Sequence, residues 1–270
     1  MAGRDGRDSG KEHMHFESRE SGKLNFVGGG INFWRAFAGE AVNFFYPPRC
    51  PVCDGVLACG VDVCAACRRQ IQTVEEPVCK RCGKPLCDER QEYCSDCAGG
   101  NHFYRQGKAV FVYRGWIRQS MYRFKYSNRR EYAVFYAGQA AQLYGEWIRR
   151  NGVDVIVPIP MYAPKQRARG YNQAEVFAQM LGRAVEIPVD AKLVRRVRNT
   201  VPQKELNGTE RSCNLKNAFQ LVPDIVKYDQ ILLVDDIYTT GSTVDAVAEV
   251  LLSAGARYIY YICISIGAGF

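Results

Sequence analysis

The sequence lacks an apolar run long enough to span a bilayer, and it shows no secretory signal. Residues 1–25 are mainly Gly, Arg, Asp, Ser, Glu, Lys and His, and no charged segment there leads into an apolar core. Such a composition cannot bury enough apolar surface to offset the entropy lost on ordering, so we expect a disordered tail over residues 1–30. We therefore expect a cytoplasmic protein with no transmembrane segment.

The next segment, residues 31–46, has apolar side chains at helical spacing and is ended by Pro47 and Pro48. These apolar side chains are Trp34, Phe37, Ala38, Ala41, Val42 and Phe45. The segment is too short and too polar to cross a membrane. We expect a helix that packs on a neighbouring domain. The alternative is an interfacial membrane helix, which the absence of a Lys/Arg stripe disfavours.

Histidine is scarce, with three residues in 270, and His13 and His15 lie in the polar tail, where solvated side chains are favoured over a metal site. Cysteine is abundant instead, with 12 residues, ten of them between positions 50 and 97. Eight form Cys-x-x-Cys pairs, a spacing that lets two thiolates turn onto one tetrahedral metal. They are Cys50, Cys53, Cys64, Cys67, Cys79, Cys82, Cys94 and Cys97.

Four such pairs predict two closed four-cysteine zinc sites with a structural role. Sequential pairing would place the first two pairs on one zinc ion and the last two on another. A cross-brace would join the first pair with the third and the second with the fourth, and the spacing allows both. A disulfide framework needs an oxidising compartment, which the missing export signal disfavours. Cys59 and Cys87 lie outside the pairs and are expected to be packed or free thiols, although each is near enough to compete as a ligand.

Acidic residues are absent between Arg105 and Arg130, where eight basic residues alternate with aromatic ones. Two interpretations fit this pattern. The stretch binds single-stranded nucleic acid, or its aromatic rings face the core while its cations face solvent or substrate phosphates. We favour the second. Lys125, in Arg-Phe-Lys-Tyr, is the candidate for reaching a phosphate.

Residues 231–243 combine the features of a phosphosugar site. An aliphatic run typical of a buried parallel strand leads to Asp235 and Asp236, and a helical pattern begins at Thr243. Between them lies a segment of small residues: Thr239, Thr240, Gly241, Ser242 and Thr243. Backbone N–H groups at a helix N-terminus bind phosphate, and the carboxylates suit ribose hydroxyls or Mg²⁺. The Gly-Lys-Ser/Thr of a Walker loop is missing.

From residue 108 onward, the hydrophobic pattern predicts the order β-α-α-β-α-β-loop-β-β-α-β. This order implies a mostly parallel sheet flanked by helices, an α/β fold. Residues 161–169 are predicted to be a loop that holds Arg167 and Arg169, and a helix is predicted to follow to Arg183. The polar segment 198–217 is predicted to be a long loop, which is uncommon unless it is disordered or acts as a lid. A lid would shield a reactive sugar cation from water.

The 234–243 segment resembles the phosphoribosyl-pyrophosphate (PRPP) motif of type I phosphoribosyltransferases. Together with the two four-cysteine patterns, the chain resembles the ComF family over residues 44–266. Further matching segments are 47–53, 123–126, 158–160, 169–173, Gln203 and 211–219. The resemblance implies a type I phosphoribosyltransferase fold and a link to DNA uptake in natural transformation. Purine-salvage enzymes of this fold have an aspartate where this chain has Thr239, which puts purine salvage in doubt.

The expected organisation is a tail (1–30), an N-terminal helix with a double zinc ribbon (31–98) and a phosphoribosyltransferase-like domain (99–270). The leading hypothesis is an enzyme that binds PRPP with magnesium. Asp235 and Asp236 would hold ribose hydroxyls or metal, residues 239–243 the 5′-phosphate, and Lys125, Arg167 and Arg169 the pyrophosphate. The alternative is a non-catalytic module that senses a phosphoribosyl ligand and binds single-stranded DNA or a protein partner.

Overall fold

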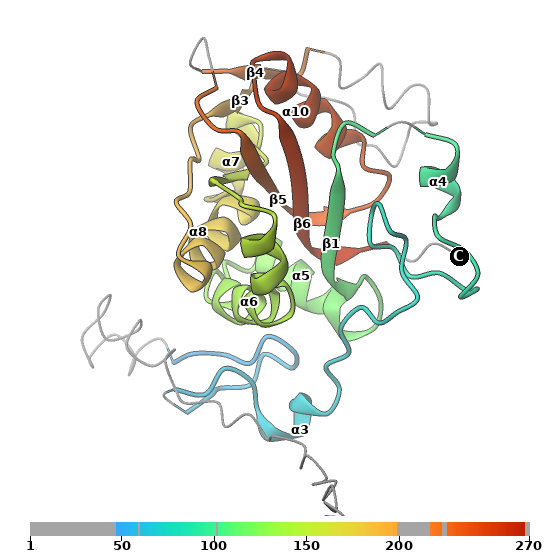
Figure 1. Ribbon diagram of the computed structural model, residues 1–270. Coiled ribbons are helices and arrows are strands. Elements are labelled where there is room, and N and C mark those ends of the chain that lie inside the picture. The colour runs from blue at the N-terminus through green and yellow to red at the C-terminus, as the bar shows by residue number, and fades with distance from the viewer. Residues whose placement is uncertain (1–46, 59, 101, 199–216, 223–225, 268–270) are drawn as a thin grey trace, which may run out of the picture.

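The computed structural model describes residues 47–58, 60–100, 102–198, 217–222 and 226–267. The expected tail, the helix at 31–46, Cys59 and nearly all of the expected lid lie outside these residues. Within them, no helix combines the length and the apolarity needed to cross a bilayer. Figure 1 shows one sheet with helices packed around it and two cysteine-rich segments attached to it.

The main sheet has four parallel strands in the order β1-β6-β5-β2. They are β1 (Gln106–Val112), β6 (Tyr258–Ile266), β5 (Gln230–Tyr238) and β2 (Val155–Pro158). The central strand β6 is buried at every residue but its first, and β5 is buried over its aliphatic run 231–234, as a parallel sheet covered on both faces requires. The mostly parallel sheet expected from the sequence is therefore confirmed. The final strand, β6, lies in the interior of the sheet.

Alternate side chains of these strands point into two separate cores. One core packs Leu232 and Val234 against α5 (Trp116–Tyr126), α6 (Tyr132–Arg150) and α8 (Gln173–Val185). The other packs Ile231 and Leu233 against α10 (Ser242–Ser253). The period of two along a strand explains the division. The two helices predicted between the first two strands, and the helix predicted to reach Arg183, are all present as α5, α6 and α8.

Two short strands form a separate antiparallel pair, β3 (Val194–Arg196) with β4 (Phe219–Leu221). Their existence was predicted, but they lie outside the main sheet. The predicted loop at 161–169 is partly wrong, because a short helix, α7, spans Ala163–Arg169. Pro164 at its start and Gly170 at its end, with φ of 87°, explain its bounds.

Each half of the cysteine-rich region adjoins a different core (Figure 1). The first half contains α3 (Ala65–Arg68), and its Cys50 and Val52 belong to the core beside α5 and α6. The second contains α4 (Ser95–Ala98), and its Cys79 and Cys82 belong to the core beside α10. Neither half is an independent appendage, because both complete cores of the sheet domain.

Candidate functional site

The eight paired cysteines form two groups of four, and within each group the sulfur atoms all lie within 4.8 Å of one another. Cys53 Sγ is 3.9 Å from Cys64 Sγ in the first group, and Cys82 Sγ is 3.5 Å from Cys94 Sγ in the second. Four sulfurs at about 2.3 Å from zinc would stand roughly 3.8 Å apart, so both groups fit the metal. The first group is Cys50, Cys53, Cys64 and Cys67, and the second is Cys79, Cys82, Cys94 and Cys97.

This grouping is the sequential one, so the cross-brace alternative is excluded by the structure. Cys87 is exposed and belongs to neither group. No cysteine of the two groups is spare, because four thiolates complete a tetrahedral zinc. The double ribbon thus holds two closed four-cysteine zinc sites of structural type.

The first ribbon contacts the sheet domain through partly buried polar groups. Asp54 accepts hydrogen bonds from Tyr132 Oη at 2.6 Å and from Arg129 at 3.1 Å. Arg123 of α5 donates to the carbonyl oxygen of Val52 at 2.7 Å. Burial opposes ionisation of Asp54, but the hydrogen bonds from Tyr132 and Arg129 outweigh it and hold the pKa of Asp54 below its ordinary value.

The acid pair lies within β5, which continues past it to Tyr238, so the aspartates do not follow the strand as expected. Lys125 of α5 reaches this pair, with Nζ 2.9 Å from Asp236 Oδ2. Asp235 Oδ1 accepts a hydrogen bond from the backbone N–H of Asp236. Burial, and next the charge of Asp236, raise the pKa of Asp235 to about 7.

Arg196 is a second cation beside the pair, and no motif in the sequence pointed to it. Its charge interacts with that of Asp235, and burial lowers its own pKa. It comes from β3, so its proximity depends on how the β3–β4 hairpin packs. The acid pair therefore lies between cations from two elements, which suits a site that holds both a divalent cation and an anionic sugar.

Residues 239–243, which we call the hydroxyl loop, are the three-residue connection after β5 and the first two residues of α10. Thr239 is exposed, Thr240 and Ser242 are partly exposed, and Gly241 is buried. Thr240 Oγ1 and Ser242 Oγ are 3.0 Å apart, so the two hydroxyls lie side by side. Gly241 precedes α10 with φ of 83°, a conformation that favours glycine. Together these features place hydroxyl groups and helix N-terminal amides at one point.

The two predicted pyrophosphate arginines differ in position. Arg169, at the end of α7, lies over the ring of Tyr126 at 4.9 Å and donates to Gln173 Oε1 at 2.9 Å. Since Tyr126 follows Lys125 directly in the chain, Arg169 lies in the neighbourhood of that lysine. Arg167 is exposed on α7, and no described contact joins it to the acid pair.

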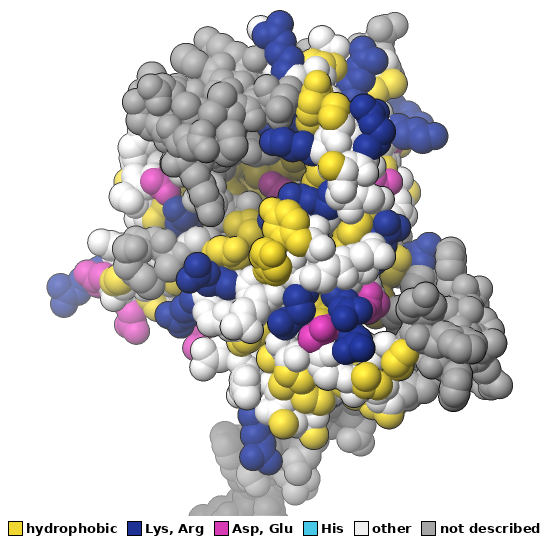
Figure 2. Space-filling model, turned by 180° about the vertical axis from the view of Figure 1, so that it is seen from behind, with side chains coloured by type: hydrophobic (Ala, Val, Ile, Leu, Met, Phe, Trp, Pro, Cys, Tyr) yellow, Lys and Arg dark blue, Asp and Glu magenta, His cyan; other side chains and the backbone are white. Residues whose placement is uncertain are grey.

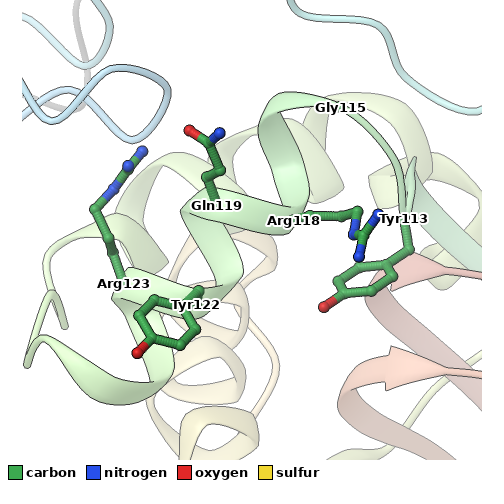
Figure 3. A pocket seen from close by; sticks show the side chains of 6 residues that line it. All are labelled: Tyr113, Gly115, Arg118, Gln119, Tyr122 and Arg123. Atoms are coloured by element: carbon green, nitrogen blue, oxygen red, sulfur yellow. The ribbon is translucent and has the colours of Figure 1, made fainter.

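An open pocket of about 530 Å³ lies along α5, away from the acid pair (Figure 3). Its lining is basic and aromatic: Tyr113, Gly115, Arg118, Gln119, Tyr122 and Arg123. Tyr122 and the neighbouring Tyr126 are each 62% exposed, with ring centroids 5.0 Å apart. The expectation that the aromatic rings of this stretch face the core is therefore wrong for these two tyrosines, although Phe124 is fully buried.

Similarity to known proteins shows the family of this chain. A family model described as Double zinc ribbon domain matches residues 41–98. Competence protein F of Haemophilus influenzae is 32% identical over 228 residues, which are 80% of this chain and 95% of that protein. The chain belongs to the ComF family. DNA utilization protein YhgH of Escherichia coli, another relative of this ComF-family chain, is 30% identical over 81% of the chain and 96% of its own length.

Among solved structures, purine phosphoribosyltransferase from Pyrococcus horikoshii is similar, with 20% identity and a TM-score of 0.30 over 51% of this chain and 72% of that chain. In this ComF-family chain the expected α/β class is confirmed. A double zinc ribbon precedes a domain in which helices flank a parallel sheet.

Proposed function

We propose that this chain binds PRPP together with magnesium and transfers its phosphoribosyl group to a nucleophilic acceptor such as a base or amine. A new bond to the acceptor forms at the ribose C1 as the bond to pyrophosphate breaks and pyrophosphate leaves. The observation that carries the proposal is the junction of β5 and α10, where an acid pair flanked by Lys125 and Arg196 adjoins the hydroxyl loop. PRPP carries a phosphate at one end of its ribose and a pyrophosphate at the other. The hydroxyl loop suits the phosphate, the acid pair suits the ribose hydroxyls or magnesium, and the cations suit the pyrophosphate.

In this proposal the hydroxyl loop binds the 5′-phosphate. The backbone amides at the start of α10 and the hydroxyls of Thr240 and Ser242 supply donors, and the helix dipole favours the anion. Gly241 has no side chain to obstruct the approach. Thr239 and Thr243 belong to the same ligand-binding segment.

Asp235 and Asp236 would bind ribose hydroxyls or hold magnesium through their oxygens, and the ion would neutralise charge that develops on the departing pyrophosphate. Lys125 would then exchange its contact with Asp236 for a phosphate oxygen. Arg169 would add a second cation from α7, and Arg167 a more peripheral one. All of these residues were selected from the sequence, whereas Arg196 enters from its place beside Asp235.

Pyrophosphate release tests the proposal. The full chain would be incubated with PRPP, magnesium and a panel of bases and amines, and compared with the double variant Asp235→Asn, Asp236→Asn. Glu249→Gln on the exposed side of α10 is the matched control for loss of a carboxylate. We expect release by the wild type and by the control but not by the double variant. Equal release by all three proteins would show that Asp235 and Asp236 do not form the site.

A second candidate function is the binding of single-stranded DNA, which the two exposed tyrosines of α5 favour. Tyr126 lies under Arg169, and Tyr113 lies under Arg118, a combination suited to stacked bases and a phosphate backbone. Figure 2 shows a face of the molecule on which Lys and Arg side chains surround hydrophobic ones and acidic side chains are few. The names of the relatives, which refer to competence and DNA utilization, are consistent with a role in DNA uptake during transformation.

Fluorescence anisotropy with a labelled oligothymidylate separates the two functions. If DNA binding is the function, affinity falls steeply with salt and falls further in Tyr122→Ala, Tyr126→Ala, while no acceptor supports pyrophosphate release. Salt-independent or absent binding would exclude this candidate. A protein that does both would retain DNA binding in the aspartate double variant.

A further inference from the structure

The second zinc ribbon contacts the sheet at a point that the proposed function does not use. The backbone N–H of Gly107, in β1, donates to the carbonyl oxygen of Arg81 at 2.7 Å, and Gln106 Nε2 donates to that of Lys80 at 3.1 Å. Tyr261, in β6, donates its hydroxyl to the carbonyl oxygen of Cys82, a zinc-site residue, at 2.5 Å. The cysteine knuckle is therefore hydrogen-bonded to two adjacent strands.

The fit at this point is tight. A Cβ on Gly107 would lie 1.8 Å from the ring of Tyr261, and a Cβ on Gly83 of the knuckle would lie 3.0 Å from the carbonyl oxygen of Gly107. Tyr261 is fully buried. Because the ring and the knuckle both press on the same strand, the position of the knuckle constrains the position of the Tyr261 ring.

Tyr261 is connected to the hydroxyl loop through one other side chain, that of Tyr238. Its ring stacks on that of Tyr238 with centroids 4.7 Å apart and planes at 5°. Tyr238 Oη is 2.7 Å from Tyr104 Oη, and a Cβ on Gly241 would lie 2.5 Å from Tyr238 Oη. Gly241 therefore packs against Tyr238, which in turn stacks on Tyr261 and lies within hydrogen-bond distance of Tyr104.

A second connection runs in parallel through Asp245, in the first turn of α10. Its carboxylate accepts a hydrogen bond from the backbone N–H of Phe103 at 2.9 Å and lies 2.7 Å from His102 Nδ1. Both partners lie a few residues beyond Cys97. The start of α10 is therefore tied to the chain that leaves the second ribbon.

We propose that Tyr261 and Tyr238 are positioning residues through which the second zinc ribbon sets the conformation of the hydroxyl loop. The first ribbon packs on α5 and α6 in the other core, so its zinc site has no such effect. The part of this inference that concerns ligand affinity rests on the proposed function, whereas the part that concerns loop conformation does not.

Amide hydrogen exchange of the ligand-free full chain tests the connection. Tyr261→Phe keeps the stacked ring and removes the hydrogen bond to Cys82. We expect exchange of the amides at 241–245 to become about fivefold to tenfold faster. Tyr136→Phe is the matched control, because it removes a buried hydroxyl that is 2.6 Å from Ser120 Oγ in the other core. Unchanged exchange at 241–245 in Tyr261→Phe, or equal acceleration in both variants, would overturn the inference.

Loss of one zinc at a time gives an independent test. Zinc content, loop exchange and calorimetric binding of ribose 5-phosphate would be measured for Cys94→Ser and for Cys53→Ser. We expect faster exchange at 241–245 only in Cys94→Ser, together with at least about tenfold weaker binding in that variant. Equal acceleration of exchange at 241–245 in the two variants would contradict the inference. If the wild type binds no ribose 5-phosphate, the proposed function fails, and the exchange data still decide the connection.

Discussion

Lys125 Nζ lies 2.9 Å from Asp236 Oδ2, so helix α5 is joined to the acid pair on β5 by an ion pair whose side chains are 17% and 16% exposed. The same helix is joined to the first ribbon through Arg123 and the carbonyl oxygen of Val52. The acid pair is thus supported from the side of the first ribbon, and the hydroxyl loop from the side of the second.

Replacement of this lysine is expected to destabilise the protein. Lys125→Met keeps most of the stem but leaves two adjacent carboxylates with one cation fewer, at a cost of about 2 kcal/mol in the free energy of unfolding. Lys165→Met is the control, since Lys165 is exposed on α7. Urea denaturation at pH 7.5 measures both. A Lys125→Met protein as stable as the control would show that the ion pair contributes nothing.

The raised pKa of Asp235 predicts a pH-dependent effect of Asp235→Asn. Ionisation in the folded state is disfavoured up to about pH 7, whereas the unfolded side chain ionises near its ordinary value, so the charge costs nothing below about pH 4 and its full amount above about pH 7. Asp235→Asn should therefore equal the wild type in stability at pH 4 and exceed it by an amount on the order of 4 kcal/mol at pH 8. Thermal unfolding at both pH values checks this, and a constant difference would refute it.

The contact between the first ribbon and the sheet domain gives a third prediction. Asp54 has φ of 62°, a conformation that asparagine tolerates, so Asp54→Asn removes charge without adding backbone strain. Loss of the ionic contact with Arg129 should lower the free energy of unfolding by about 2 kcal/mol. Asp62→Asn is the control in the same ribbon, because its pair with Arg68 is exposed and worth about 0–1 kcal/mol. Equal stability of the two variants would contradict the prediction.

The zinc stoichiometry gives a fourth prediction. Native mass spectrometry of the full chain should show two zinc ions, two in Cys87→Ser and one in Cys64→Ser, because Cys87 belongs to neither cluster. Loss of one zinc in Cys87→Ser would mean that the ligand sets are assigned wrongly.

The parts of the fold that the sequence predicted are those with a strong local signal. The continuous aliphatic run at 231–234 indicated a buried strand, and the apolar stripe of α10 indicated a helix. The cysteine pairs likewise indicated zinc. Which pairs share a zinc ion could not be predicted from the sequence, because the four pairs have the same internal spacing. Only the folded chain brings particular pairs together.

Other features depend on tertiary packing. The three-residue strands β3 and β4 carry no signal that would separate them from the main sheet, and Arg196 reaches Asp235 only through that hairpin. The exposure of Tyr122 and Tyr126 was predictable in principle. They are four residues apart on α5 and lie opposite the buried Ile117, Met121 and Phe124.

Calorimetric titration of the full chain with PRPP, with and without magnesium, measures whether the acid pair and the hydroxyl loop form one ligand site. We expect saturable binding at one site that requires magnesium and is lost in the double variant Asp235→Asn, Asp236→Asn, while thermal unfolding shows that the variant is folded. Absence of binding by the wild type, or equal binding by the folded double variant, would contradict this expectation.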